Sequence, residues 1–510
     1  MEGFEEDLAK LAKNYGIDYF DAIRDDFVAD GCTIPAAWAM ARCLLPASIN
    51  GRDILFMASP DDIEALEAAS RAAGRVFEPA LAPREAILEA LAKKFAPVGA
   101  ASGAAPVADT PATASSDLLG DDGGAPATRF INSMILRAIS EGASDVHVEP
   151  FADATSVRFR IDGVLHPRDA VPHGLEQAVV SRLKVMAGMD ISERRLPQDG
   201  MAEVRIGGNS IDIRVSSIPV DAGERMVLRL LNREDAHLPL GGLGMAGGVL
   251  AAFRSLVASP NGIIVISGPT GSGKTTTLYA ALGEIDSAHR NILTIEDPVE
   301  YRLKGVGQMQ VKPKIGLTFA SGLRHILRQD PDVILVGETR DAETAEIAVR
   351  ASLTGHLVLT TLHTNDAPSA IVRLTDMGIP PYLVASSLRG VLAQRLVRML
   401  CPNCRAKTAP DPRDLARPFV NEAWRERLNA DGVFAAAGCG KCTEGRRGRT
   451  GVFELMPCTR EVAALVRDGI SDAAALRRAA GDGFFSMADD ALPKVAAGAI
   501  DLAEVAGVFV

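Results

Sequence analysis

A glycine-rich segment in the second half of the chain has the residue types and spacing of a phosphate-binding loop. Its sequence is Gly268-Pro269-Thr270-Gly271-Ser272-Gly273-Lys274-Thr275, between an apolar run and a stretch of helical character. Glycines let the backbone curl until its N–H groups converge on phosphate oxygens, and the N-terminus of a helix expected to start near Thr276 adds its dipole. In such a loop Lys274 contacts the β and γ phosphates, and the Thr275 hydroxyl binds Mg²⁺. We therefore predict that residues 268–276 bind ATP with its magnesium ion.

Acidic side chains follow two other apolar runs, where neighbouring strands are expected to end. Glu338 follows one run, and we predict that it is the magnesium-side carboxylate, bound directly or through water. Gly337 occupies the place where many P-loop proteins have the metal-binding aspartate. Glu296, Asp297 and Glu300 follow the other run, and one of them is expected to be the general base that deprotonates the attacking water. The residue pattern alone leaves the choice among these three acids open.

A histidine closes a third apolar run. His363 follows residues 357–362 and precedes the polar residues 364–366. A neutral imidazole at the end of a strand can hydrogen-bond the γ-phosphate and report whether ATP or ADP is bound. We predict this role for His363.

Four of the seven cysteines form two Cys-x-x-Cys pairs: Cys401 with Cys404, and Cys439 with Cys442. In a reducing compartment, this spacing indicates a metal site rather than a disulfide framework. Each pair can supply two of the four thiolates of a tetrahedral Zn²⁺ ion. We expect a structural zinc site that orders an irregular segment.

The elements around these motifs predict an α/β protein. In the segment that bears the loop, short apolar runs alternate with helical stretches, which is the pattern of a buried, mostly parallel sheet; the runs are residues 263–266, 292–295, 333–336 and 357–359. Further upstream, alternating runs predict a second sheet half covered by helices; the strands are expected at residues 156–161, 203–206 and 211–215, and a helix at 175–186.

A chain of 510 residues is too long for one hydrophobic core, so we expect several domains. Residues 98–128 contain mainly Ala, Gly, Pro, Ser and Asp and predict a flexible linker. The expected sequence of parts is a small α/β module at 1–97, this linker, a second domain at 129–236, a short linker at 237–244, a nucleotide-binding core at 245–400, a tetracysteine subdomain at 401–442 and a helical region at 443–510.

Charge and hydropathy restrict the function classes. The formal net charge of −11 and a pI near 5.4 argue against a nucleic-acid motor, because no global basic field is available to bind phosphate backbones. No apolar run is long enough to span a bilayer, and the acidic start of the chain lacks the basic region of a signal peptide. We therefore expect a cytoplasmic protein.

The nucleotide-binding core contains four motifs, which are in chain order the loop at 268–275, the acidic residues at 296–300, Glu338, and the apolar run that ends at His363. Together and in this order, they resemble the motifs of the secretion superfamily ATPases of type II secretion and type IV pili. The stretch 354–367 is similar to the histidine box of that family, and residues 143–150, 160–163 and 196–200 are similar to its second domain. The resemblance covers the chain from about residue 128 to the C-terminus, and more weakly the first module. It implies a RecA-like P-loop ATPase domain, preceded by a PAS-like α/β domain and a small N-terminal module.

The resemblance also implies roles for particular residues. Glu300 becomes the expected catalytic glutamate, and Arg214 and Arg229 of the second domain become expected arginine fingers. Such guanidinium groups neutralise charge on the transferring phosphoryl group. A tetracysteine subdomain is similar to that of family members that export or assemble, whereas retraction ATPases generally lack it.

The implied function is ATP hydrolysis that drives pseudopilus assembly in a type II secretion system. The expected assembly is a homohexamer at the cytoplasmic face of the inner membrane, near an inner-membrane platform protein. Residues 1–97 are expected to dock on the cytoplasmic domain of an inner-membrane secretion-platform protein, and anionic lipid is a further candidate partner. The alternatives are a type IV pilus assembly ATPase, a nucleic-acid translocase, and a nucleotide-binding scaffold without useful turnover.

Overall fold

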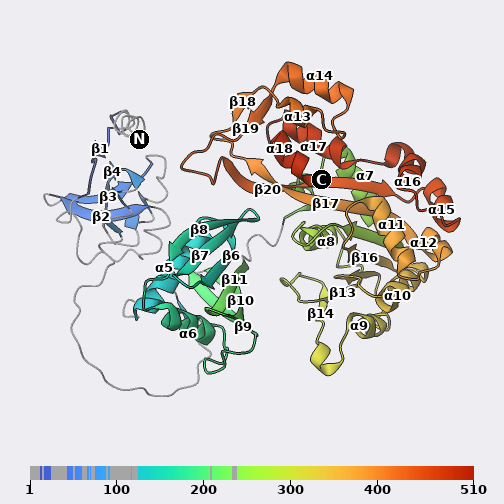
Figure 1. Cartoon of the computed structure of the whole chain (residues 1–510), viewed down its shortest axis with the longest axis horizontal. Coiled ribbons are helices and arrows are strands. Elements are labelled where there is room, and N and C mark those ends of the chain that lie inside the picture. Colours follow the sequence, from blue (N-terminus) through green and yellow to red (C-terminus); the bar gives the residue numbers. More distant parts are fainter. Residues whose placement is uncertain are drawn as a thin grey trace. The chain divides into compact units, whose positions relative to one another are not determined.

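The computed structural model describes residues 125–206, 209–231 and 238–509, together with residues 116–117 and parts of the segment 12–91 (Figure 1). The chain divides into two compact units, Met1–Arg233 and Glu234–Val510. Most of the expected linker at 98–128 lies outside the described residues. Among the described residues, no helix combines the length and the apolar character needed to cross a membrane.

The first module contains a small four-stranded sheet. Its strand order is β1 (Asp18–Tyr19), β4 (Glu78–Leu81), β3 (Arg52–Met57) and β2 (Leu44–Ile49). β3 runs parallel to β4 and antiparallel to β2, and Leu55 and Phe56 are fully buried. The α/β character expected for this part of the chain is consistent with this sheet.

The second domain is a seven-stranded sheet with helices on one face. Its order is β5 (Ser116–Asp117), β9 (Gln198–Ile206), β10 (Asn209–Val220), β11 (Gly223–Leu231), β6 (Ala143–Pro150), β7 (Thr155–Ile161) and β8 (Val164–Ala170), and its helices are α5 (Pro126–Ser140) and α6 (Glu176–Met186). Val157, Phe159 and Ile161 alternate with partly exposed positions along β7 and pack in one core with Ile131 of α5 and Leu183 of α6. The predicted strands and the predicted helix of this domain are confirmed.

The second unit contains the predicted parallel sheet. Its order is β14 (Gly307–Gln310), β13 (Ile292–Glu296), β15 (Val333–Val336), β16 (Leu357–Leu362), β12 (Gly262–Ser267), β17 (Leu388–Leu400) and β20 (Arg446–Pro457). Neighbouring strands are parallel except β20, which runs antiparallel to β17. β20 falls in a range that we expected to be helical, and its buried run from Val452 to Met456 completes the sheet instead.

Helices cover both faces of this sheet, and Figure 1 shows them around it. On one face, Ile264 and Ile266 share a core with Phe253 of α7 (Gly247–Val257) and with α8 (Lys274–Gly283). On the other face, Ile263 and Val265 pack with the remaining core helices; these are α9 (Phe319–Ile326), α10 (Ala342–Leu353), α11 (Ala367–Asp376) and α12 (Pro381–Ser387). Burial on both faces explains the continuous apolar runs of the strands.

The segment after Cys401 is ordered and packs on the same core. A two-stranded ribbon and several helices form it, with Leu415 and Leu428 in the core of the large sheet. The elements are β18 (Ala406–Thr408), α13 (Pro412–Leu415), α14 (Glu422–Asp431), β19 (Val433–Ala435), α15 (Arg460–Arg467), α16 (Ala473–Ala480), α17 (Met487–Ala496) and α18 (Leu502–Val508).

Candidate active site and tetracysteine cluster

The phosphate-binding loop connects β12 to α8, and its glycines adopt conformations that other residues rarely adopt. Gly268, Gly271 and Gly273 have φ values of +150°, +79° and +85°. A Cβ atom on Gly268 would lie 2.5 Å from the Ser272 Oγ atom and from a backbone oxygen of β17. Only glycine fits there without displacing the loop. Helix α8 starts at Lys274 rather than near Thr276, so Thr275 and Thr276 lie in its first turn.

Lys274 is the cation at the centre of this loop. Its side-chain Nζ donates to the carbonyl oxygens of Gly268 at 2.7 Å and Pro269 at 2.9 Å. The residue is buried, and this burial lowers the pKa of Lys274 to about 8, a shift that Arg395 increases and Glu338 opposes. A buried ammonium group held by loop carbonyls at a helix N-terminus favours an anionic ligand.

Glu338 and His363 lie at the same edge of the sheet as the loop. The parallel strands β12, β15 and β16 end there. Thr361 Oγ1, near the end of β16, donates a hydrogen bond to the carbonyl of Gly337, directly after β15, at 2.7 Å. His363 Nε2 is 3.7 Å from Glu338 Oε2, and Arg340 Nε is 2.8 Å from Glu338 Oε1. The structure therefore brings together these two predicted site residues.

His363 is poised to stay neutral. Burial and the nearby Lys274 charge lower the pKa of His363, although Glu338 opposes the shift. A neutral imidazole can donate or accept one hydrogen bond without adding charge. This state suits the nucleotide-reading role predicted for it.

The space next to β13 explains why glycine precedes Glu338. A Cβ atom on Gly337 would lie 3.2 Å from the Ile295 carbonyl oxygen and 3.3 Å from Glu296 Cα. An aspartate at this position would crowd β13, so the acidic side chain stands one residue later. The Glu338 carboxylate and the Thr275 hydroxyl are oxygen donors of the kind that Mg²⁺ prefers.

The three acids after β13 differ in burial. Glu296 is buried and accepts hydrogen bonds from Thr294, Tyr279 and, at 3.2 Å, Gln308. Burial and the Glu296 carboxylate raise the pKa of Tyr279, so its phenol stays protonated as a donor. Asp297 and Glu300 are exposed. This difference makes Glu296 a structural acceptor and leaves Asp297 and Glu300 as the exposed candidates for the base.

Two further polar residues at the site come from β17, in the middle of its apolar run. Gln394 is 2% exposed, and its Nε2 donates to the Ser272 carbonyl at 2.7 Å. The neighbouring Arg395 donates from Nη2 to the backbone and side-chain oxygens of Asn365, at 3.0 and 3.1 Å. The sequence analysis did not single out either residue, although two polar residues inside a buried apolar strand were a usable signal.

The predicted arginine fingers lie on adjacent strands of the second domain. Arg214 of β10 is directly opposite Arg229 of β11, and both are exposed. Like charges opposite each other destabilise a sheet, which favours an anionic partner at this position.

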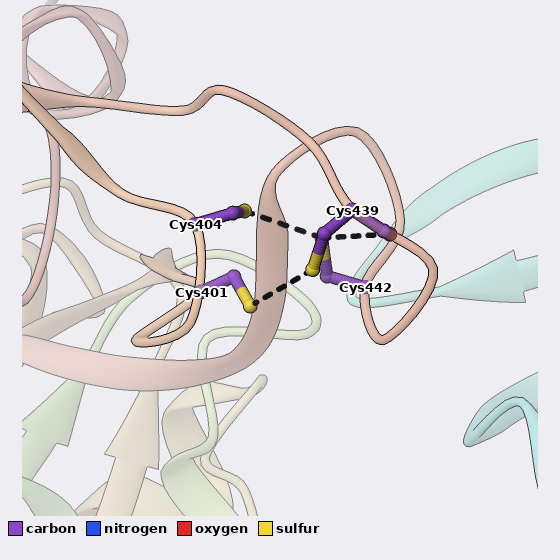
Figure 2. A group of neighbouring side chains, drawn as sticks. All are labelled: Cys401, Cys404, Cys439 and Cys442. Atoms are coloured by element: carbon purple, nitrogen blue, oxygen red, sulfur yellow. Dashed lines mark hydrogen bonds between the residues drawn. The ribbon is translucent and has the colours of Figure 1, made fainter. Parts of the chain in front are cut away.

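The four predicted cysteines form one compact cluster (Figure 2). Their sulfur atoms all lie within 4.8 Å of one another, with Sγ–Sγ distances of 4.0 Å for Cys401–Cys439, 3.7 Å for Cys404–Cys442 and 3.6 Å for Cys439–Cys442. Tetrahedral Zn–S bonds of about 2.3 Å place sulfur atoms roughly 3.8 Å apart. The cluster therefore fits a Zn²⁺ ion held by four thiolates.

The sheet, the loop and the strand-end residues define a P-loop nucleotide-binding protein. The family model described as "Type II/IV secretion system protein" matches residues 121–507, and the chain belongs to this family. The chain is 50% identical to the type II secretion system protein HxcR of Pseudomonas aeruginosa over 390 residues, which cover 76% of this chain and 78% of the relative. It is also 50% identical to the type II secretion system ATPase E of Vibrio cholerae over 392 residues, 76% of each chain.

Solved structures show the same fold. The Legionella pneumophila ATPase DotB aligns with a TM-score of 0.55 at 22% identity, covering 75% of this chain and 95% of DotB. The pilus retraction motor PilT with bound ADP aligns with a TM-score of 0.50 at 26% identity, covering 74% of this chain and 96% of PilT.

Proposed function

We propose that this chain hydrolyses ATP to power protein export by a type II secretion system. The observation that carries the proposal is the convergence of the Lys274 loop, Glu338 and His363 at one sheet edge, in a chain half identical to type II secretion proteins. The names of these relatives favour type II secretion over type IV pilus assembly.

The residues support a phosphoryl-transfer mechanism with divided roles. The loop N–H groups and Lys274 hold the β and γ phosphates, and Glu300 takes a proton from the attacking water. Mg²⁺, held by Thr275 and Glu338, would neutralise charge on the β and γ oxygens. Arg214 and Arg229 place positive charge beside the transferring phosphoryl group. His363 hydrogen-bonds the γ-phosphate and so distinguishes bound ATP from bound ADP.

The proposal extends to the assembly in which the chain works. The chain works as a homohexamer at the cytoplasmic face of the inner membrane, beside a platform protein. Residues 1–97 dock on the cytoplasmic domain of a membrane-anchored partner, and the 98–128 segment acts as a tether. Anionic lipid is a candidate stimulus of the assembled ring.

Replacing Lys274 with alanine tests the enzymatic part. We expect phosphate release to fall by at least about 100-fold, because the cation that neutralises the phosphates is lost. Lys407→Ala, at an exposed lysine of β18, is the matched control and should keep wild-type turnover. Wild-type turnover in Lys274→Ala would contradict the proposal. In cells, deletion of the gene should abolish secretion and leave pili intact; the loss of pili alone would point to pilus assembly instead.

A further inference from the structure

One row of side chains crosses four strands of the second domain and contains three arginines and one aspartate. Arg160 of β7 is opposite Asp145 of β6, Asp145 is opposite Arg229 of β11, and Arg229 is opposite Arg214 of β10. Residues directly opposite on neighbouring strands share a face, and here it is the face away from the core that holds Val146, Leu228 and Val215. The row therefore contains three guanidinium groups and one carboxylate, and Asp145 is paired directly with two of them, Arg160 and Arg229.

Asp145 is fixed in this row. Its side chain is only 8% exposed, and its Oδ2 accepts a hydrogen bond from Ser144 Oγ at 2.8 Å. Its Oδ1 accepts from Arg229 Nε at 3.0 Å, whereas Arg160 Nε stays 3.8 Å from Oδ2 and Arg160 Nη1 donates to the Gly163 carbonyl. Arg229 thus has the closest ion pair with Asp145.

Asp145 contacts the Arg229 guanidinium through its Nε edge. Asp145 accepts from the Nε atom, and within the described part of the chain the two terminal Nη groups of Arg229 donate no hydrogen bond. The Arg229 side chain is 58% exposed. The edge of the guanidinium that can bind a phosphoryl oxygen pair is consequently left open, while the side chain is held in place.

We propose that Asp145 is a positioning residue for the arginine finger Arg229. Its carboxylate fixes the Nε edge, presents the Nη groups for a phosphoryl oxygen, and offsets the repulsion between Arg229 and Arg214. Three arginines against one carboxylate keep the row positive, so the finger still attracts an anion. The inference rests on the proposed ATPase function and on the finger role of Arg229.

A second ion pair on the same strand provides a contrast. Glu149 Oε2 and Oε1 accept from Arg158 Nε at 2.5 Å and Nη2 at 2.8 Å, and Arg225 Nη2 lies 2.7 Å from Oε1. Arg158 is bound through both its Nε and an Nη group, so its binding edge is already used. Glu149 is as buried as Asp145 but holds no predicted finger, which makes Glu149→Gln a matched control.

The test is steady-state ATP hydrolysis by the assembled full-length protein in a double-mutant cycle. We expect Asp145→Asn to lower kcat about tenfold with the KM for ATP nearly unchanged, because only the transition-state contact of Arg229 is disturbed. Arg229→Ala should lower kcat at least as far, and adding Asp145→Asn to it should cost nothing more. Glu149→Gln should keep wild-type kcat.

Ser144→Ala is a milder variant that keeps the test decisive if Asp145→Asn fails to fold. It removes the hydroxyl that donates to Asp145 Oδ2 at 2.8 Å and, more weakly, to the Arg160 carbonyl at 3.3 Å. It should lower kcat several-fold in the wild type and not at all in Arg229→Ala. Multiplicative losses in either double mutant would overturn the positioning role and leave Asp145 as a sheet stabiliser. Wild-type kcat in Arg229→Ala would instead remove the finger role, and the loss of turnover in Lys274→Ala would still stand as a separate result.

Discussion

At the scale of single residues, the charge on Lys274 links nucleotide binding to pH. Burial lowers its pKa to about 8 in the loop without a nucleotide. Triphosphate charge stabilises the ammonium form and raises this pKa on binding. Above about pH 8 the vacant loop loses the proton that the bound state keeps, so ATP affinity should fall as the pH rises through that value.

Calorimetry can detect this coupling directly. ATP is titrated into the protein in two buffers of different ionisation enthalpy, and the difference between the measured heats gives the number of protons taken up. We expect net proton uptake at pH 8.5 and a smaller uptake at pH 7. Lys274→Arg is the control, because a guanidinium does not titrate in this range and should show no such uptake. Equal proton uptake by the wild type and by Lys274→Arg would contradict the assignment to Lys274.

The sequence predicted those site residues whose chemistry depends on local spacing. The loop at 268–275 and each of the two Cys-x-x-Cys pairs belong to this class, because the residues within each motif lie a few positions apart. Among the three acids after β13, burial sets Glu296 apart, which the spacing does not show, and Glu300 is preferred to Asp297 only through the family resemblance. The row formed by Arg229 and Asp145 depends on strand register, which no local pattern determines.

At the scale of elements, β17 is the strand that supports the phosphate-binding loop. Gln394 is directed from its middle to the Ser272 carbonyl, and a Cβ on Gly273 would lie 3.3 Å from Gln394 Nε2. Gln394→Met keeps the approximate volume and removes this donor. We expect the KM for ATP to rise about tenfold with a smaller change in kcat, because the loop loses its fixed conformation before it binds phosphate.

Gln177→Met, at an exposed position of α6 in the second domain, is the control for this substitution. It should leave both kinetic constants unchanged. An unaltered KM in Gln394→Met would show that the loop keeps its shape without β17.

The parallel strands were predictable and the strand that completes their sheet was not. The runs at 263–266, 292–295 and 333–336 are short, apolar and separated by helical stretches, so their pattern suffices. In β17 the pair Gln394-Arg395 interrupts the apolar run. β20 pairs with β17 only after the whole tetracysteine segment, so its membership of the sheet is a long-range property.

Helix α17 ties the start of the second unit to β20 through one buried carboxylate. Asp490 is fully buried and accepts from the backbone N–H groups of Ala246 at 2.8 Å and Phe453 at 3.0 Å, and it also pairs with Lys494. Asp490→Asn should destabilise the second unit by about 3 kcal/mol, because Lys494 is left buried without its counter-charge. Thermal unfolding measures the change as a lowered midpoint.

The neighbouring Asp489 is the matched control for Asp490. It is exposed and completes a capping box with Ser486 at the start of α17. Asp489→Asn should cost no more than about 1 kcal/mol. Equal midpoints for the two variants would show that the buried carboxylate contributes no more than the cap.

At the scale of the whole molecule, the family match does not include the first module, residues 1–97. The family model begins at residue 121, so the docking role of residues 1–97 has support only from the resemblance. Its β-sheet was predictable from apolar runs, but a docking surface depends on a partner that the sequence does not contain. For the same reason, the sequence of this chain does not identify the exported proteins.

The tetracysteine cluster closes the end of the β17–β20 ribbon. Cys401 directly follows β17, and β20 begins shortly after Cys442, with Leu400 paired to Arg446. Arg446 pairs with Asp501 at the start of α18. A metal ion at the cluster would therefore fasten the two strands together at this end of the ribbon, whose middle supports the loop.

Removal of zinc should accordingly weaken both stability and nucleotide binding. We expect about one Zn²⁺ per chain in the purified protein, lost in Cys404→Ser/Cys439→Ser, with an unfolding midpoint lower by several degrees. The KM for ATP should rise, because Gln394 is held less firmly under the loop, while the residual activity still depends on Lys274. Cys458→Ser is the control: this cysteine lies outside the cluster, and burial raises the pKa of its thiol to about 11, so it should change neither the metal content nor the midpoint. A double variant that lost its zinc yet kept the wild-type midpoint and KM would show that the ribbon holds the loop without the metal.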